Sequence, residues 1–429
     1  MRRTIDEALR RWKQSKDRMP LLLDGARQVG KTYALVKFAK ENYDDCVHVN
    51  LDISSRIRES LDLNISPESI LKVVEAETQQ KIVPGKSLLI LDEIQSSERA
   101  LSALKYFCED APQYHVAAAG SLLGAAINRE RYSFPVGKVN SLHMYPMDFE
   151  EYLWARNEKV LADEIRDGFE RMMPLLPSLH LKAIELYRDY LICGGMPRCV
   201  QALATGQSLR EISWLQREIL DNYLADMARY ASNSETVKIR SCFESIPAQL
   251  AKENHKFQYR VVRKGGSAAV FGASIEWLRL AGVVLKCQNV EHGYLPLSAY
   301  ADLSAFKLYM ADVGLLTMRT QLPHSIILSG HENTFMGALT ENYVAQQLAA
   351  HGHELYYWTS DGRAELDFVT PTEEGIAAIE VKKGEHTKGK SLRIFMGKYK
   401  PNVVIRLALK EFGSYDGIRT VPLYATHCL

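Results

Sequence analysis

Leu21-Leu-Leu-Asp-Gly25-Ala-Arg-Gln-Val-Gly30-Lys-Thr32 is the stretch that decides the fold of the first third of the chain. It contains the pattern G-x-x-x-x-G-K-[ST], preceded by a short apolar run and followed by a helical pattern. The glycines let backbone N–H groups wrap a phosphate, and the start of the helix adds partial positive charge. This context predicts a phosphate-binding loop between a buried strand and a helix.

The loop assigns roles to its last residues. Lys31 is placed to reach the β- and γ-phosphates of ATP, and the Thr32 hydroxyl to bind Mg²⁺. ATP and Mg²⁺ are therefore the expected cofactors. The residues expected to bind the nucleotide lie in and beside the loop: Gly25, Ala26, Gln28, Val29, Gly30, Lys31, Thr32 and Tyr33.

Ser87-Leu-Leu-Ile-Leu-Asp92-Glu93 supplies the second half of an ATP site. An unbroken apolar run predicts a strand buried on both faces, which delivers Asp92 to its carboxyl end. Asp92 is suited to hold Mg²⁺, and Glu93 to orient and deprotonate the attacking water. Ser121 ends the next predicted strand, where its hydroxyl could sense the γ-phosphate or cap the following segment. Both roles of Ser121 stay open.

The first 145 residues alternate strand-like and helix-like stretches, which predicts a parallel sheet covered on both faces. The expected strands are Pro20–Asp24, Val47–Leu51, Ser87–Leu91 and His115–Ala119, and the expected helices are Thr4–Gln14, Lys31–Lys40, Ile70–Gln80 and Arg99–Asp110.

From Pro146 onward the apolar residues first follow helical spacing. The expected helices are Asp148–Arg156, Leu179–Cys193, Leu209–Tyr230, Ser241–Lys252 and Ala268–Leu280. Two strands, Val283–Val290 and Tyr294–Ser298, are then expected around a turn at His292-Gly293, a pattern typical of a winged helix. The last hundred residues predict the order α-β-β-β-α-β: Phe335–His351, Leu355–Thr359, Glu365–Thr370, Ile376–Lys382, Ser391–Tyr399 and Val403–Leu409.

Several motifs taken together resemble one family, the bacterial and archaeal AAA+ ATPases that carry a C-terminal domain of unknown function. They are Gly25–Thr32, Leu91-Asp-Glu-Ile-Gln95, Gly120-Ser121, Tyr145-Pro-Met-Asp-Phe-Glu-Glu-Tyr152 and Gly194-Gly-Met-Pro197. The resemblance covers nearly the whole chain. It implies an α/β fold with a P-loop AAA+ parallel-sheet core (1–145), a helical lid (146–235), a winged helix (236–325) and a restriction-endonuclease-like α/β domain (326–429).

The resemblance also implies roles for single residues. Gly194–Pro197 would lie in the lid near adenine or ribose, Pro197 among the residues that bind the nucleotide, with Arg198 as a candidate γ-phosphate sensor. A simple helix break is the alternative for this segment. Relatives often show Gly-Arg where this chain has Gly137-Lys138, and lysine lacks the planar fork of arginine. Arg131, or its neighbour Arg129, could supply the arginine finger instead.

Glu365-Leu-Asp367 and Ile379-Glu380-Val-Lys382 look like the two halves of a PD-(D/E)xK nuclease signature, and Glu341 occupies the place of its additional acid. Strand alternation puts Glu380 and Lys382 on one side. We expect Glu341, Asp367, Glu380 and Lys382 to converge in one pocket suited to Mg²⁺. Charged edge strands are the alternative, and we expect cleavage to be absent or weak.

The net charge of +1 over 429 residues neither demands nor excludes nucleic acid. A local basic stretch, Arg260-Val-Val-Arg-Lys-Gly-Gly266, precedes the helix Ala268–Leu280, which favours DNA slightly over a solvated face or a protein-binding module. We therefore expect an oligomeric ATPase, possibly a hexamer, acting on DNA in remodelling, recombination or repair. The alternatives are an ATP-gated signalling or defence switch and a chaperone-like ATPase acting on a protein.

Two further expectations concern the compartment. The seven cysteines are scattered with no CxxC pair, so reduced thiols in a cytoplasm are expected. The polar, charged N-terminus is unlike a signal peptide, and no apolar run approaches the roughly 18 residues of a membrane span, so no membrane partner is expected.

Overall fold

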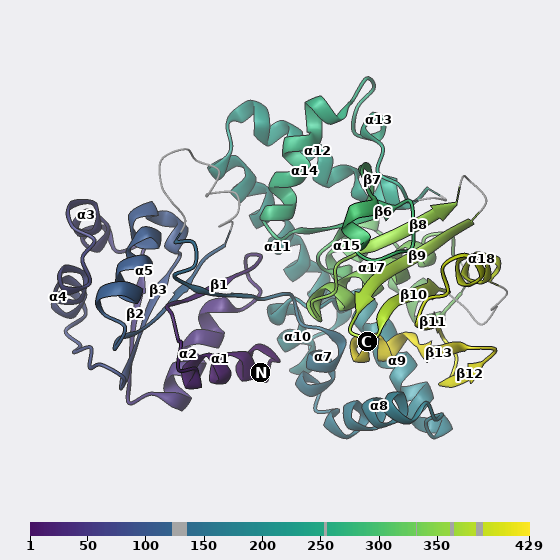
Figure 1. The fold of residues 1–429 in the computed structure, drawn as a ribbon, viewed down its shortest axis with the longest axis horizontal. Coiled ribbons are helices and arrows are strands. Elements are labelled where there is room, and N and C mark those ends of the chain that lie inside the picture. The colour runs from purple at the N-terminus through teal and green to yellow at the C-terminus, as the bar shows by residue number, and fades with distance from the viewer. Residues whose placement is uncertain (122–134, 253–254, 332, 361–363, 383–388) are drawn as a thin grey trace. The chain divides into compact units, whose positions relative to one another are not determined.

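The computed structural model describes residues 1–121, 135–252, 255–331, 333–360, 364–382 and 389–429 (Figure 1). The chain forms two compact units. The N-terminal unit comprises Arg2–Tyr145 with Leu280–Gly282, and the C-terminal unit comprises Met1, Pro146–Arg279 and Val283–Leu429. We describe each unit by itself.

The N-terminal unit contains a five-stranded sheet in the order β2-β3-β4-β1-β5, with every neighbouring pair parallel. Strand β1, which leads into the phosphate-binding loop, lies between β4 and β5. The described elements are α1 (Ile5–Gln14), β1 (Leu21–Asp24), α2 (Lys31–Asn42), β2 (Asp45–Asn50), α3 (Ser55–Leu63), α4 (Pro67–Thr78), β3 (Ser87–Asp92), the 3-10 helix η1 (Ile94–Ser96), α5 (Glu98–Asp110), β4 (His115–Ala119) and β5 (Asn140–His143).

Alternation along the strands divides this core into two layers. In β3, Leu88 and Ile90 pack with residues of α1 and α2, whereas Leu89 and Leu91 pack with residues of α3, α4 and α5. All six residues of β3 are buried. A parallel sheet covered on both faces requires such apolar strands, because neither face meets water. Because all five strands are parallel, their carboxyl ends, which carry the polar side chains, lie at the same edge of the sheet.

The C-terminal unit is rich in helices before its sheet begins. They are α7 (Phe149–Ala155), α8 (Lys159–Arg171), α9 (Pro177–Cys193), α10 (Pro197–Ala204), α11 (Leu209–Tyr230), α12 (Asn233–Leu250), α13 (Tyr259–Val262), α14 (Ala268–Leu280), α15 (Val313–Thr320), α16 (His324–Ser329), α17 (Met336–Ala350) and α18 (Lys390–Tyr399), with 3-10 helices η2 (Leu297–Tyr300) and η3 (Leu423–Cys428).

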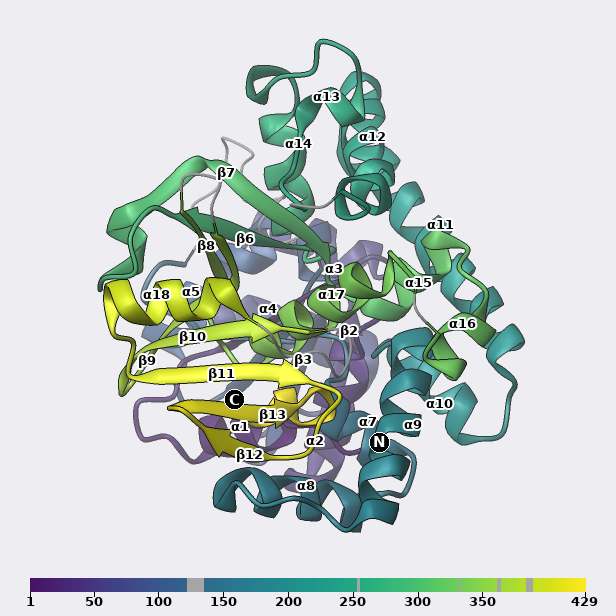
Figure 2. The ribbon, with the colours of Figure 1, turned by 90° about the vertical axis from the view of Figure 1, so that its right-hand side faces the viewer.

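Eight strands of this unit form one mixed sheet in the order β12-β13-β11-β10-β9-β8-β6-β7 (Figure 2). Helix α18 packs on it through Leu392 and Phe395, which share a core with Trp358 and Ala378. The strands are β6 (Val284–Val290), β7 (Ala301–Met310), β8 (Tyr356–Ser360), β9 (Ala364–Thr372), β10 (Gly375–Val381), β11 (Val403–Ala408), β12 (Gly413–Tyr415) and β13 (Ile418–Pro422).

The α/β class with a parallel P-loop sheet and a second mixed-sheet unit is confirmed. The strand expected at Tyr294–Ser298 is wrong. That segment is loop and 3-10 helix, in which Pro296 has no N–H to donate, and the partner of β6 is β7, from Ala301 onward. Because β6 also pairs with β8, these strands belong to the large sheet. The finer division of residues 146–429 into lid, winged helix and nuclease-like domain stays a prediction.

Among the described residues, no helix combines the length and apolarity that crossing a membrane would require.

Candidate functional site

The loop between β1 and α2 has the backbone of a phosphate-binding loop. Gly25 and Gly30 have φ of 139° and 95°, values that side-chain-bearing residues rarely adopt. The Lys31 ammonium is buried and donates to the carbonyl oxygens of Gly25 at 2.9 Å and Ala26 at 2.7 Å. Burial lowers the pKa of Lys31 to about 8. Lys31 thus joins the two ends of the loop by hydrogen bonds. A bound phosphate would stabilise the charge of its ammonium.

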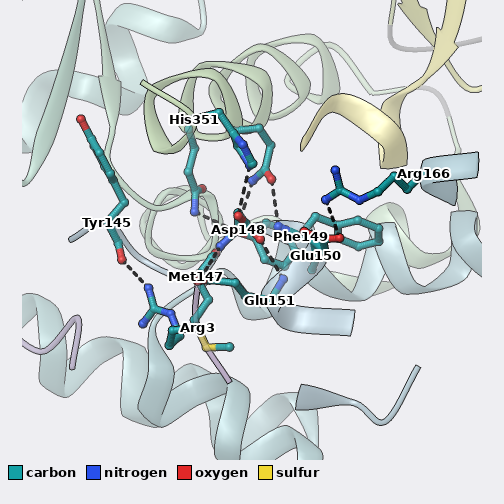
Figure 3. Close-up of polar contacts among 12 residues, drawn as sticks. Arg3, Tyr145, Met147, Asp148, Phe149, Glu150, Glu151, Arg166 and His351 are labelled. Atoms are coloured by element: carbon teal, nitrogen blue, oxygen red, sulfur yellow. Dashed lines mark hydrogen bonds and ion pairs between the residues drawn. The ribbon is translucent and has the colours of Figure 1, made fainter. Parts of the chain in front are cut away.

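Packing and one arginine fix the loop from behind. The side chains of Ala26 and Val29 belong to the core shared with α1 and α2. Arg3 donates to the Val29 carbonyl at 3.0 Å and to the Tyr145 carbonyl at 2.8 Å (Figure 3). A Cβ at Gly25 would lie 2.2 Å from the Met144 carbonyl oxygen, so only glycine fits there. These contacts fix the backbone of the loop against the core of the unit. Gln28 and Tyr33 are exposed.

Asp92 lies directly opposite the start of α2. The Thr32 hydroxyl donates to Asp92 Oδ2 at 2.9 Å, and His48 Nε2 lies 3.2 Å from the same oxygen. The Glu93 N–H donates to Asp92 Oδ1 at 3.0 Å. Burial alone would raise the pKa of Asp92, but the hydrogen bonds from His48, Thr32 and the Glu93 backbone outweigh it, and the pKa is lowered. The carboxylate is therefore ionised and paired with the hydroxyl that the motif assigns to Mg²⁺.

Glu93 and Ser121 are joined through Gln95. The Gln95 side-chain amide donates to Glu93 Oε2 and, at 3.4 Å, to Ser121 Oγ, and its oxygen accepts from the Ser121 N–H at 3.3 Å. Arg27 Nε donates to Ser121 Oγ at 3.2 Å. Glu93 has a left-handed backbone with φ of 52°. The structure thus brings the predicted residues Lys31, Thr32, Asp92, Glu93 and Ser121 into one connected group.

Four members of this site were missed by the sequence analysis: Arg3, Arg27, His48 and Gln95. Gln95 stands inside the Leu-Asp-Glu-Ile-Gln motif, and Arg27 inside the loop motif, so each had a signal that was not used. His48 could have been found from strand order, because β2 lies beside β3 with Asn50 opposite Asp92. Nothing in the sequence points to Arg3.

Pro197 and Arg198 lie in the C-terminal unit, at the start of α10. Arg198 pairs with Glu218 at 2.6 Å. The preceding Gly195 is tightly packed: its N–H donates to Asp312 Oδ2 at 2.6 Å, and its carbonyl accepts from the Met147 N–H at 2.7 Å. These contacts favour a structural role for the Gly-Gly turn. Nucleotide contacts of Pro197 and Arg198 stay predictions.

The assigned arginine finger, Arg131, and its neighbour Arg129 lie outside the described residues. Lys138, of the Gly137-Lys138 pair, forms an ion pair with Glu109 at 3.0 Å.

The acids of the Tyr145–Tyr152 motif form a structural network (Figure 3). Asp148 caps α7, accepting from the Glu151 N–H at 2.8 Å, and its Oδ2 lies 3.1 Å from His351 Nε2. Burial opposes ionisation of Asp148, but the hydrogen bond from His351 outweighs it and lowers its pKa. Glu150 pairs with Arg166 at 2.7 Å. This motif therefore anchors α7 to α17 and α8.

The four residues of the nuclease-like signature are linked through Asp367, on which the charges of both Glu341 and Lys382 act. Glu341, on α17, accepts from Tyr309 at 3.1 Å and lies 3.4 Å from Lys307 Nζ. Asp367, on β9, accepts from the Val381 N–H at 2.7 Å. Its pKa is raised to about 7, first by burial and then by the charge of Glu341, so these two acids are neighbours.

Glu380 and Lys382 have partners of their own. Glu380 Oε1 lies 3.2 Å from Lys382 Nζ, and Oε2 accepts from Arg406 at 3.0 Å. A Cβ at Gly389 would lie 2.2 Å from Glu380 Oε2, so this carboxylate is enclosed. Within the described part of the chain, no three His, Cys, Asp or Glu side chains are placed to hold a metal ion. Glu380 is neutralised locally by Lys382 and Arg406, and the convergence of the four residues on Mg²⁺ stays a prediction.

The parallel sheet and phosphate-binding loop of the N-terminal unit are typical of a P-loop AAA core. A parallel sheet delivers the phosphate-binding loop and the Asp92-Glu93 pair to one edge. Residues 17–153 match the family model described as AAA domain.

Two further family models match later parts of the chain, and both are described as domains of unknown function: DUF8612 over residues 184–325 and DUF4143 over residues 336–426. No curated protein matches the sequence.

Among solved structures, the chain is similar to the Walker-type ATPase of Pyrococcus abyssi, with 15% identity over 73% of this chain and 95% of that one and a TM-score of 0.45. It is also similar to the Aeropyrum pernix ORC1 protein in complex with DNA (12% identity, 76% and 92% covered, TM-score 0.32). A third is the Thermotoga maritima RuvB Holliday junction branch migration motor (13% identity, 67% and 86% covered, TM-score 0.28).

Proposed function

We propose that this chain binds ATP with Mg²⁺ at the loop between β1 and α2 and hydrolyses it. The observation that carries the proposal is the hydrogen bond of 2.9 Å between the Thr32 hydroxyl and Asp92 Oδ2, beside the buried Lys31. A hydroxyl and a carboxylate oxygen are the hard ligands that Mg²⁺ prefers. When bound, the ion would neutralise phosphate charge.

The chain's own residues divide the remaining work. Lys31 exchanges its two carbonyl contacts for phosphate oxygens, which restores the charge stabilisation that its buried site lacks. Glu93 accepts the proton of the attacking water, and Gln95 holds the Glu93 carboxylate in place while contacting Ser121. Ser121 and Arg27 then lie on the side of the loop where the γ-phosphate would be sensed.

Two substitutions test this assignment. Lys31→Ala should abolish ATP binding, because it removes the ammonium from the phosphate site. Glu93→Gln should bind ATP but lower kcat by roughly 10²-fold or more, because the geometry survives and the base is lost. The controls are Lys40→Ala, an exposed lysine of the same helix, and Glu59→Gln, an exposed glutamate of α3. Full turnover by Glu93→Gln would remove the catalytic role of Glu93.

We further propose that ATP turnover is used on DNA. Arg260, Arg263 and Lys264 are exposed and precede α14. Arg260 donates to the neutral Gln258 side chain at 3.0 Å, whereas Arg279 on α14 is held by the carboxylate of Glu276 through contacts of 2.5–3.1 Å. Contacts with phosphate oxygens bind the backbone and not the sequence. The three exposed cations are thus the part of the basic stretch that supports DNA binding.

Fluorescence anisotropy with duplex and branched DNA tests this proposal. Affinity should fall steeply with salt, and Arg263→Glu with Lys264→Glu should weaken binding by roughly 10-fold or more, because two phosphate contacts become repulsive. The matched control reverses two exposed arginines on α11, Arg210 and Arg217. If no DNA form binds at low salt or stimulates the ATPase, a protein partner becomes the leading interpretation.

A further inference from the structure

Lys307 is a lysine with no exposed surface. It stands on β7, between the apolar neighbours Phe306 and Leu308, in a run of buried residues. A buried ammonium costs several kcal/mol unless opposite charge and hydrogen-bond acceptors surround it. The surroundings of Lys307 therefore decide why it is tolerated.

Acidic side chains from two other elements meet Lys307. Its Nζ lies 2.6 Å from Glu365 Oε1 on β9 and 3.4 Å from Glu341 Oε2 on α17. It also lies 5.0 Å from the centre of the Tyr357 ring. The charges of Glu341, Glu365 and Asp367 all favour its protonated form and outweigh burial, so the pKa of Lys307 is raised. The ammonium thus contacts the carboxylates of Glu341 and Glu365, and the charge of a third acid, Asp367, acts on it.

Glu341 has further donors on the same oxygen. His255 Nδ1 lies 2.9 Å from Glu341 Oε2, and the Tyr309 hydroxyl donates to it at 3.1 Å. Together with Lys307, these groups fill the coordination space of that oxygen with hydrogen-bond donors. The lone pairs of this oxygen are then occupied by hydrogen bonds and are not free to coordinate a metal ion.

We propose that Lys307 is the resident cation of the Glu341–Glu365–Asp367 cluster, taking the place that a divalent ion would occupy in a nuclease-like site. Of the three acids expected to hold Mg²⁺, Glu341 lies 3.4 Å from Lys307 Nζ, Asp367 acts on the lysine through its charge, and Glu380 is held by Arg406 and Lys382. The C-terminal sheet is therefore stabilised by an internal ion cluster, and the native cluster takes up no divalent metal.

The proposal explains why β7 belongs to this sheet. An ammonium is a compact charge with three donors, and here it reaches the acids from the edge strand. Its neighbour β6 pairs with β8, so the β6–β7 pair is fixed to the sheet by backbone hydrogen bonds as well. The inference concerns the C-terminal unit alone and does not depend on ATP hydrolysis.

Removing the lysine tests the proposal by creating a metal site. In a Lys31→Ala background, which silences the ATP site, Mn²⁺ binding is measured by electron paramagnetic resonance and by thermal unfolding. The parent should take up no Mn²⁺ at this cluster. Lys307→Ala should bind one Mn²⁺ and regain several degrees of Tm on its addition, because the ion replaces the lost charge.

Asp367→Asn added to Lys307→Ala should abolish this gain, which assigns the ion to the cluster. Lys307→Met, which keeps most of the side-chain volume, serves if the alanine variant fails to fold, and Mn²⁺ should rescue it likewise. Two results would overturn the proposal: Mn²⁺ binding by the parent that Asp367→Asn removes, or no Mn²⁺ binding by either folded Lys307 variant.

Discussion

Lys31 and Lys307, the two buried lysines in the described part of the chain, show how surroundings set the behaviour of one residue type. Lys31 donates to two neutral carbonyls, and burial lowers its pKa to about 8. Lys307 contacts carboxylates, and its pKa is raised. The hydrogen-bond acceptors of the first lysine are neutral, as expected where a phosphate has to bind. The second already has its counter-charges, as expected of an internal ion cluster.

Asp367 gives a residue-scale prediction of pH dependence. Its pKa is raised from 3.8 to about 7, by burial and by Glu341, while Lys307 and Lys382 act in the opposite direction. Between pH 4 and 7 the folded state holds a proton that the unfolded state has released, so stability falls as pH rises through this window. Asp367→Asn removes this loss and keeps an oxygen that accepts from the Val381 N–H.

Thermal unfolding at pH 5 and pH 8 checks this prediction. The free energy of unfolding of Asp367→Asn minus that of the parent should be larger at pH 8 than at pH 5, by on the order of 2 kcal/mol. Glu341, whose pKa is lowered to about 2, titrates below this range. Glu365, His255 and Tyr309 face the same cluster and are present in both the parent and the variant. The exposed Asp163→Asn on α8 is the control. An equal effect of Asp367→Asn at both pH values would contradict the assignment.

At the scale of elements, the Gly194-Gly195 turn joins α9 to α10 by close backbone contact. A Cβ at Gly195 would lie 1.9 Å from the Met147 carbonyl oxygen, which is backbone and cannot step aside. Gly195→Ala should therefore lower stability by roughly 2 kcal/mol or more. Gly337, on α17, has nothing within 4 Å of its would-be Cβ. Gly337→Ala should be neutral or stabilising by about 0.5–1 kcal/mol, because alanine favours the helix.

Thermal unfolding of these two variants separates a packing role from a nucleotide role. A stability loss confined to Gly195→Ala supports the packing role. If Gly195→Ala instead leaves stability unchanged and weakens ATP binding, the turn would be assigned to the nucleotide site.

Elements with a strong local signal could be predicted from the sequence. The P-loop combined a motif with its strand and helix, and β3 was an uninterrupted apolar run. The partner of β6 could not be predicted from its nearest apolar stretch, because the loop before Ala301 is long and β7 carries a lysine in its buried part. Lys307 looks like an exposed residue in sequence, and only the fold brings the acids of α17 and β9 to it.

At the scale of the whole molecule, the question is whether the arginine that completes the ATP site comes from the same chain or from a neighbouring subunit. We predict that this ATPase is active as an oligomer, because AAA+ sites usually gain an arginine from a neighbouring subunit. Arg27, which donates to Ser121, offers a competing arrangement in which the cation comes from the same chain. Turnover per subunit should rise with concentration if the first arrangement holds, and stay constant if the second does.

Mixing two inactive variants decides between these arrangements. Glu93→Gln lacks the base but keeps every arginine, whereas Arg131→Ala keeps the base and lacks the assigned finger. If the finger acts on the neighbouring site, a mixed oligomer contains interfaces with both groups intact, so mixing should restore roughly a quarter of parental turnover for random assembly. Arg129→Ala, mixed in the same way, identifies which of the two arginines serves. If neither mixture regains activity while Arg27→Ala alone stops hydrolysis without preventing ATP binding, the cation comes from the same chain and oligomerisation is not needed for catalysis.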